Sequence, residues 1–185
     1  TVGLLIFGVG EAFLVQSNLG NSPWVVFSQG IAGKTGISLG WATFAISCVV
    51  LLLWIPLKER PGFGTLLNIA VIAFALQIGV DRFPLQSTFT HGLIYAFAGI
   101  ALVGIASALY ITCGLGPGPR DGLMTGLHHY TGIRVGRVRL GIESLVLVIG
   151  ALLGGRVGLG TALFAVFIGQ SIAISFGLLA RLTHR

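Results

Sequence analysis

A series of long apolar stretches, with almost no charged residues inside them, constrains this chain most. The stretches cover about residues 2–16, 41–57, 65–80, 93–113, 140–153 and 160–182. Only 9% of the 185 residues are charged, which is too few to cover a water-exposed surface. Because a helix needs roughly 20 apolar residues to cross a bilayer, the sequence predicts an all-α membrane protein. We expect six transmembrane helices in one transmembrane domain over 1–185.

The two halves of the chain resemble each other when one is shifted by 96 positions. The coinciding residues are mainly Gly, Pro, Thr and Arg in the same order, and they include the pairs Gly20/Gly116, Pro23/Pro119, Thr35/Thr131 and Arg60/Arg156. Chance matches between apolar helices would involve mainly Leu, Ile, Val and Ala. We therefore predict a duplication, with repeat 1 at about 1–88 and repeat 2 at about 97–185.

Three spans per repeat is an odd number, so the second repeat is expected to lie inverted relative to the first. With the N-terminus inside, the inner loops hold most basic residues, namely Lys58, Arg60, Arg120, Arg134, Arg137, Arg139, Arg181 and Arg185. The outer loops hold Lys34, Arg82 and Arg156. This asymmetry predicts that both termini are cytoplasmic. It also accounts for the net charge of +6 through topology and lipid headgroups, without nucleic-acid binding.

Each repeat contains a Gly-rich polar segment that is followed by a proline and a short helix. Residues 18–24 read Asn-Leu-Gly-Asn-Ser-Pro-Trp, and residues 114–121 read Gly-Leu-Gly-Pro-Gly-Pro-Arg-Asp. Each helix is expected to run about three turns and to end at Thr-Gly, either re-entering the membrane or lying on its surface. The N-terminus of a half-helix offers free N–H groups and a partial positive charge. Two inverted ends would suit an anionic or polar group near the midplane, whereas the alternative is a tight turn before a surface helix.

The candidate substrate-binding residues surround these two segments and one acidic residue of the first span. They are Glu11, Gly20, Pro23, Trp24, Gly116, Pro119, Arg120 and Asp121. Arg120 and Asp121 form an adjacent charged pair that suits a zwitterionic or charged substrate, or else a surface ion pair of little energetic weight. The first repeat has Trp24 and Val25 at these positions, so the two halves are not equivalent.

Two carboxylates lie inside predicted spans, where an ionisable group is costly and indicates function. Glu11 lies shortly before the first Gly-rich segment and is the candidate for carrying a coupling proton. Glu143 lies near Arg137 and Arg139, so a structural ion pair is expected there. The segment Gly150–Gly154 has small-xxx-small spacing and predicts a helix-packing face.

No nucleotide-binding, hydrolase or zinc-protease motif is present in the sequence, and His128 and His129 have no converging ligands. We therefore expect no catalytic residues, no metal site and no cofactor.

The repeated Leu-Gly-x-x-Pro, followed by Thr-Gly-Ile-x-x-Gly and then by Arg-x-Gly-x-Gly-Thr, resembles the YczE/YyaS/YitT-like family of bacterial membrane proteins. The resemblance covers nearly the whole chain. It implies a multi-pass protein of the bacterial cytoplasmic membrane and supplies no catalytic residues. The family pattern has Pro-Trp-Asp in the first copy, whereas this chain has Pro23-Trp24-Val25 and an acidic residue only at Asp121.

The leading hypothesis is a small secondary transporter or exporter of a small polar, anionic or amphiphilic molecule bound between the repeats. The alternative is a non-transporting membrane subunit that binds a lipid or a partner protein, with 134–139 docking on anionic headgroups. A homodimer fits either reading.

Overall fold

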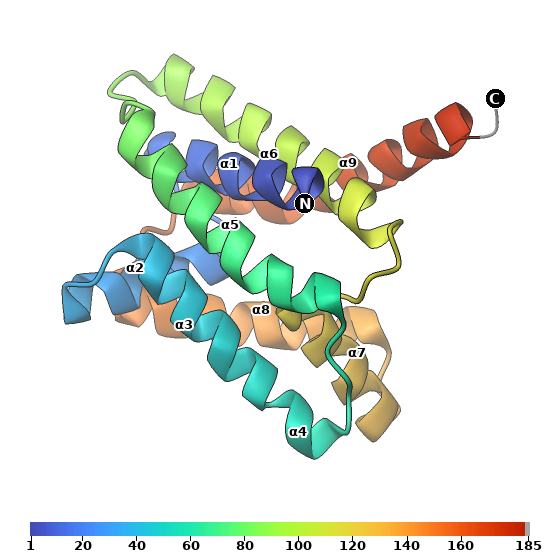
Figure 1. Cartoon of the computed structure of the whole chain (residues 1–185). Helices are drawn as coiled ribbons and strands as arrows, with labels where there is room; N and C mark the ends of the chain where they lie inside the picture. Colours follow the sequence, from blue (N-terminus) through green and yellow to red (C-terminus); the bar gives the residue numbers. More distant parts are fainter. Residues whose placement is uncertain (184–185) are drawn as a thin grey trace.

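The computed structural model describes residues 1–183 as a helical bundle, and no strand forms among these residues. Arg185, counted above among the inner basic residues, lies outside them. The helices, shown in Figure 1, are α1 (Val2–Gln16), α2 (Pro23–Thr35), α3 (Leu39–Leu52), α4 (Trp54–Leu57), α5 (Phe63–Arg82), α6 (Phe89–Ile111), α7 (Pro119–Thr131), α8 (Val135–Leu152) and α9 (Leu159–Thr183).

Four helical segments of the described chain are long and apolar enough to cross a membrane. They are Leu39–Leu57, Phe63–Arg82, Phe89–Ile111 and Leu159–Arg181. The other two predicted spans do not meet these criteria, because one is too short and the other carries several charged residues. Helix α1 has 15 residues, which gives about 22 Å against a hydrocarbon core of about 30 Å. Helix α8 has 18 residues, but its first half carries Arg137, Arg139 and Glu143. The prediction of a helical membrane protein is thus confirmed, and four helical segments of the described chain are candidates for full-length spans.

The predicted second span is interrupted near its end. Helix α3 stops at Leu52, Leu53 keeps a right-handed helical backbone, and the single turn α4 follows it. The Trp54 side chain at the start of α4 is buried, with 2% of its surface exposed. Its indole Nε1 donates a hydrogen bond to the Pro119 carbonyl oxygen at 3.0 Å. The interruption therefore ties the end of α3 to the start of the short helix α7.

The helices form two groups (Figure 1). In the first group α1 packs between α5 and α6, and α6 also packs against α9. In the second group the short helices α2 and α7 pack against α3 and α8. Helix α5 joins the groups through contacts with α3 and α7. The loops that enter α2 and α7 therefore pass from the first group to the second.

Small residues allow the long helices of the first group to approach closely. A methyl group on Gly8 of α1 would lie 2.6 Å from the Ala75 Cβ and 2.7 Å from the Ile72 carbonyl oxygen of α5. At the matching position of the second half, a methyl group on Gly104 of α6 would lie 2.7 Å from the Ser171 Cβ of α9. Both helix pairs thus pack backbone to backbone, as small residues permit in membrane proteins.

The predicted small-residue face of α8 is only partly correct. Gly150 packs against α2, since an added Cβ would lie 2.6 Å from the Phe27 backbone nitrogen. The prediction is wrong for Gly154, which lies beyond the end of α8 with φ +98° and has no neighbour within 4 Å of an added Cβ. The second small residue against α2 is instead Gly155, just beyond the end of α8, where an added Cβ would lie 2.8 Å from the Val26 Cγ1.

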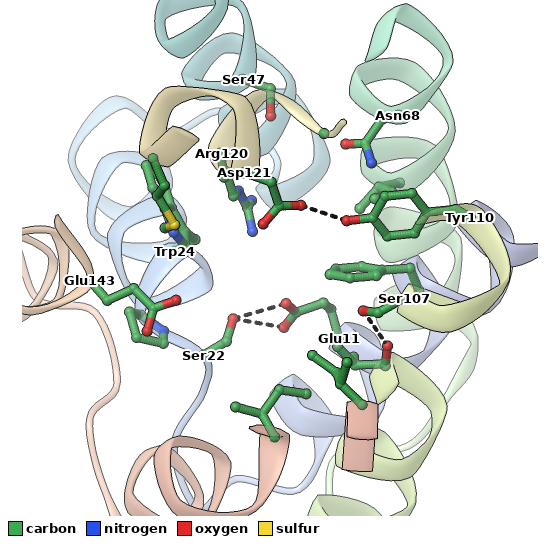
Figure 2. A pocket seen from close by; sticks show the side chains of 18 of the residues that line it. Glu11, Ser22, Trp24, Ser47, Asn68, Ser107, Tyr110, Arg120, Asp121 and Glu143 are labelled. Carbon is green, nitrogen blue, oxygen red and sulfur yellow. Dashed lines mark hydrogen bonds between the residues drawn. The ribbon is translucent and has the colours of Figure 1, made fainter. Parts of the chain in front are cut away.

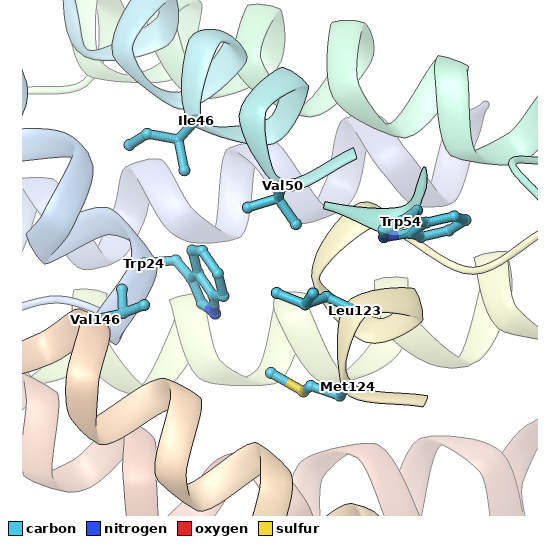
Figure 3. Close-up of a cluster of buried hydrophobic side chains, with 7 residues drawn as sticks. All are labelled: Trp24, Ile46, Val50, Trp54, Leu123, Met124 and Val146. Atoms are coloured by element: carbon cyan, nitrogen blue, oxygen red, sulfur yellow. The ribbon is translucent and has the colours of Figure 1, made fainter. Parts of the chain in front are cut away.

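A hydrophobic cluster fills the interior of the second group, drawn in Figure 3. Its buried members are Trp24, Ile46, Val50, Trp54, Leu123, Met124 and Val146. They come from α2, α3, α4, α7 and α8, so the cluster holds the two short helices in place. Trp24 and Met124 are the members that also line the candidate site.

Candidate functional site

The two short helices begin and end alike. Pro23 and Pro119 occupy the first turn of α2 and α7, where the missing proline N–H costs no hydrogen bond. Each helix has 13 residues and ends at a left-handed glycine, Gly36 or Gly132. This confirms the predicted three-turn helices that end at Thr-Gly. The first turn of α2 is buried and that of α7 is buried or half-buried, whereas the last turn of each helix is exposed, so their N-termini point into the protein.

The loops before these helices are held by matching backbone hydrogen bonds. Gly20 and Gly116 both have φ +112°, a conformation that residues with a side chain rarely adopt. The carbonyl oxygen of Leu19 accepts from the Gly160 N–H at 2.7 Å, and that of Leu115 accepts from the Gly64 N–H at 2.8 Å. The loop before α2 is therefore hydrogen-bonded to the first turn of α9, and the loop before α7 to the first turn of α5.

A cavity of about 170 Å³, measured as the space open to the centre of a water-sized sphere, lies where the two helix groups meet. Side chains from every helix except the single turn α4 line it. Five of the predicted site residues are among them, namely Glu11, Pro23, Trp24, Arg120 and Asp121. Figure 2 shows Arg120 and Asp121 pointing from α7 toward the space above Glu11 and Ser22.

Three predicted site residues lie outside the lining. Gly20 and Gly116 shape the braced loops, and Pro119 is fully buried with its carbonyl oxygen bonded to Trp54. Their part is to position the helix starts, because a glycine or a buried proline presents no polar side chain to a ligand. The structure therefore brings the charged and aromatic candidates together around the cavity. Gly20, Gly116 and Pro119 instead lie outside the cavity lining.

Glu11 is the buried carboxylate of the site and is 2% exposed. Helix α1 carries it to the cavity, and the Ser22 hydroxyl lies 2.8 Å and 3.0 Å from its two oxygens. Ser22 immediately precedes α2, so this contact links the first long helix to the start of the first short helix. A carboxylate held only by a hydroxyl can exchange a proton without breaking an ion pair.

Arg120 lies in the first turn of α7, and its guanidinium carbon is 5.0 Å from the centre of the Trp24 ring. A guanidinium over an indole face is a favourable cation–π contact. Among the described residues, Arg120 has no ion-pair partner within 4.0 Å and its side chain donates no hydrogen bond. It does not pair with its neighbour Asp121, so the alternative of a surface ion pair between them does not apply.

Asp121 instead accepts a hydrogen bond from the Tyr110 hydroxyl at 2.6 Å. Tyr110 comes from the end of α6 and was not among the predicted site residues. Polar residues inside other apolar spans also line the cavity and were missed, namely Thr43, Ser47, Asn68 and Ser107. Their only signal in the sequence is a hydroxyl or amide within an apolar stretch, which most often serves helix packing.

Glu143 forms the predicted ion pair, since the Arg139 Nε lies 2.9 Å from its Oε1 one turn away on α8. Both side chains also line the cavity, which the sequence analysis did not expect. Within residues 1–183, no three His, Cys, Asp or Glu side chains gather as a metal site would require.

Comparison with known proteins places the whole chain in one family. DUF6198, described as a family of unknown function, matches residues 1–176. A Haemophilus influenzae protein named "Uncharacterized protein" is 46% identical over all of this chain and 87% of its own length. The Bacillus subtilis "Uncharacterized membrane protein YczE" is 31% identical over 94% of this chain and 81% of its own length.

A second Bacillus subtilis protein, "Uncharacterized protein YyaS", is 28% identical over 88% of this chain and 83% of its own length. The resemblance to YczE and YyaS that the sequence motifs indicate is thus confirmed. No solved structure matches the chain.

Proposed function

The chain belongs to DUF6198, a family of unknown function, and we propose that this member is a small secondary transporter or exporter whose substrate binds in the central cavity. The central cavity is the observation that supports this proposal most strongly. Glu11, Arg120 and Asp121 meet there in a protein whose residues are only 9% charged. Ionisable groups at membrane depth are costly, and in transporters they mark substrate and proton pathways.

The proposed architecture is a six-helix inverted repeat, with halves at about 1–88 and 97–185. Matching features at positions 96 apart support it. The two short helices have equal lengths, Gly20 and Gly116 share one φ value, and the Leu19 and Leu115 carbonyls make equivalent contacts. In this arrangement α2 and α7 are re-entrant half-helices whose N-termini meet at the cavity, as in known transporter folds.

The two halves do not pack equally, and this supports a protein with two conformations. Helix α5 packs along α3, whereas the corresponding pair in the second half, α8 and α9, makes little or no contact within the described residues. In inverted-repeat transporters, the two halves exchange conformations to expose the site on alternate sides. We propose that the other conformation closes α9 on α8 and separates α5 from α3.

The proposed location is the bacterial cytoplasmic membrane, with both termini cytoplasmic. The relatives reported above come from bacteria. The excess of basic residues in the loops assigned to the inside supports this orientation.

The test is a thermal-shift screen of purified protein against small anions, zwitterions and amphiphiles, repeated on Arg120→Ala. Arg137→Ala is the matched control, since Arg137 is exposed and outside the cavity lining. A compound that stabilises wild type and Arg137→Ala, but not Arg120→Ala, is then tested for flux into liposomes. Flux that persists in both Glu11→Gln and Arg120→Ala would reject this site.

A second candidate function is a non-transporting subunit that binds a lipid, a partner protein or a second copy through α8 and α9. The supporting observation is that α8 buries only Val146 and Gly150, and that most of the apolar surface of α9 is exposed. Native mass spectrometry from lipid nanodiscs tests it. A stoichiometric co-purifying partner or lipid, together with no flux of any screened compound, would favour this function.

A further inference from the structure

Residues that line the cavity carry hydrogen-bond donors that have no partner among the described residues. The Trp24 indole Nε1 and the Thr43 hydroxyl are both buried and unbonded, at 6% and 2% residue exposure. An unsatisfied buried polar group destabilises a protein. The guanidinium of Arg120, which lies against the Trp24 ring, is likewise without an acceptor among the described residues. Trp24 on α2, Thr43 on α3 and Arg120 on α7 all line the same cavity.

The acidic groups of the same cavity are all engaged. Both oxygens of Glu11 contact the Ser22 hydroxyl, Asp121 accepts from Tyr110, and Glu143 is paired with Arg139. An ammonium ligand could use only the remaining lone pairs of carboxylates that already accept a donor from the protein. An oxygen acceptor would find free donors already in place, so the unoccupied hydrogen-bonding capacity of the site is suited to an anion.

We infer that the cavity binds a small carboxylate with an apolar body, and that it takes up one proton with each carboxylate. A carboxylate presents two coplanar oxygens, which the planar fork of an arginine binds through two parallel hydrogen bonds. The Trp24 and Thr43 donors remain for its other lone pairs. The walls contributed by α5 and α9, including Ile69, Ile72 and Ile168, suit an aliphatic or aromatic body. This inference rests on the proposed function, since it names the substrate class of the same site.

The proton follows from the charges that line the cavity. Its titratable groups are Glu11 on α1, Tyr110 on α6, Arg120 and Asp121 on α7, and Arg139 and Glu143 on α8. The lining residues from α2, α3, α5 and α9 add none. Three carboxylates against two guanidiniums leave one excess negative charge when all are ionised, and a bound carboxylate would add a second.

Glu11 is the site for the proton. Glu143 is held by an ion pair and Asp121 by the Tyr110 hydroxyl, whereas the only hydrogen-bond partner of the Glu11 carboxylate is the Ser22 hydroxyl. The Arg120 charge acts on both Glu11 and Asp121, so it does not separate them. Protonated Glu11 can donate to that hydroxyl in place of accepting from it, so the contact persists in both forms. Carboxylate binding and protonation of Glu11 are therefore coupled, which is the requirement for proton-linked transport.

The experiment is isothermal titration calorimetry on the purified full chain in detergent, with butyrate and benzoate as probes. Titrations in two buffers of different ionisation enthalpy measure affinity and protons taken up per ligand. We expect about one proton per carboxylate in wild type, and no binding of butylamine, benzylamine or benzamide. Glu11→Gln keeps the Ser22 contact and should bind the probes with no proton uptake. Arg137→Ala is the control and should match wild type in both quantities.

Two nearly isosteric variants test the donors without removing a charge. Trp24→Phe keeps the ring under Arg120, and Thr43→Val keeps the side-chain volume. Each should weaken carboxylate binding by roughly tenfold, because each removes a hydrogen bond to a charged ligand. Unchanged affinity in both variants, equal binding of the amines, or binding to wild type without proton uptake would overturn the inference.

Liposome measurements separate this inference from the proposed function. Carboxylate binding with proton uptake, but without flux, would leave the ligand class standing and reject transport. Flux of another solute by a protein that binds no carboxylate would keep transport and overturn the inference.

Discussion

Replacing Gly8 by alanine should destabilise the protein through one close helix contact. The new methyl group would lie 2.6 Å from the Ala75 Cβ and 2.7 Å from the Ile72 carbonyl oxygen, both parts of the α5 wall. Real Cβ contacts shorter than about 3.4 Å are rare, so α1 and α5 would have to separate by several tenths of an ångström. Overpacking of this kind costs about 1–3 kcal/mol, and the better helix propensity of alanine offsets at most about 1 kcal/mol of that cost.

Gly33→Ala is the matched control, because Gly33 is also inside a helix and has no atom within 4 Å of an added Cβ. We expect it to be neutral or stabilising by up to about 1 kcal/mol. The double variant Gly8→Ala/Ala75→Gly should recover part of the loss and not all of it, since the Ile72 carbonyl remains in the way.

The assay is unfolding by a graded mole fraction of SDS in mixed micelles, followed by circular dichroism. If Gly8→Ala unfolds at the same SDS fraction as wild type while Gly33→Ala behaves as expected, α1 and α5 do not pack at the separation described here. Backbone-to-backbone packing would then not hold for this helix pair.

Three further predictions concern the short helices and the orientation in the membrane. Trp54→Phe should lower the free energy of unfolding by about 1 kcal/mol, because it removes the hydrogen bond to Pro119. Amide hydrogen exchange at the start of α7 should become faster, and unchanged exchange there would contradict this prediction. Gly20→Ala should cost at least about 1 kcal/mol in SDS unfolding, because its φ of +112° strains any residue with a side chain; a neutral effect would mean that the loop adopts another conformation. In a background without the native cysteines, Lys34→Cys should react with a membrane-impermeant maleimide on intact cells and Arg137→Cys only after permeabilisation, and the reverse pattern would refute cytoplasmic termini.

Much of the fold could be predicted because it depends on local chemistry. Proline before a short helix and Thr-Gly after it predict the bounds of α2 and α7, since proline suits a first turn and glycine suits a left-handed end. The helical membrane class follows from apolar length and scarce charge. The sequence analysis did not predict the interruption at Leu53, although Pro56 marks it, since a proline cannot donate a hydrogen bond to the carbonyl of Leu52. The contact between Trp54 and Pro119 is decided only by the fold.

The site was predictable where a single residue is anomalous by itself. Glu11 inside an apolar span and the charges at 120 and 121 are conspicuous in the sequence, and all three line the cavity. Tyr110 and Thr43 were not predictable, because a tyrosine or threonine in an apolar helix is ordinary. Tyr110 and Thr43 line the cavity only because of how α6 and α3 are rotated about their axes.

Apolar length and scarce charge are enough to predict a helical membrane protein. The repeated Gly and Pro residues are enough to predict two similar short helices, because these features act locally along the chain. The tertiary structure alone decided the pairing of those charges. Arg120 lies over Trp24 and not beside Asp121, Asp121 accepts from Tyr110, and Glu11 is left with a hydroxyl. These contacts depend on the angles at which the helices cross and on the rotation of each helix about its axis. Small residues such as Gly8 allow helices to cross closely, but they do not specify which charged side chains come into contact.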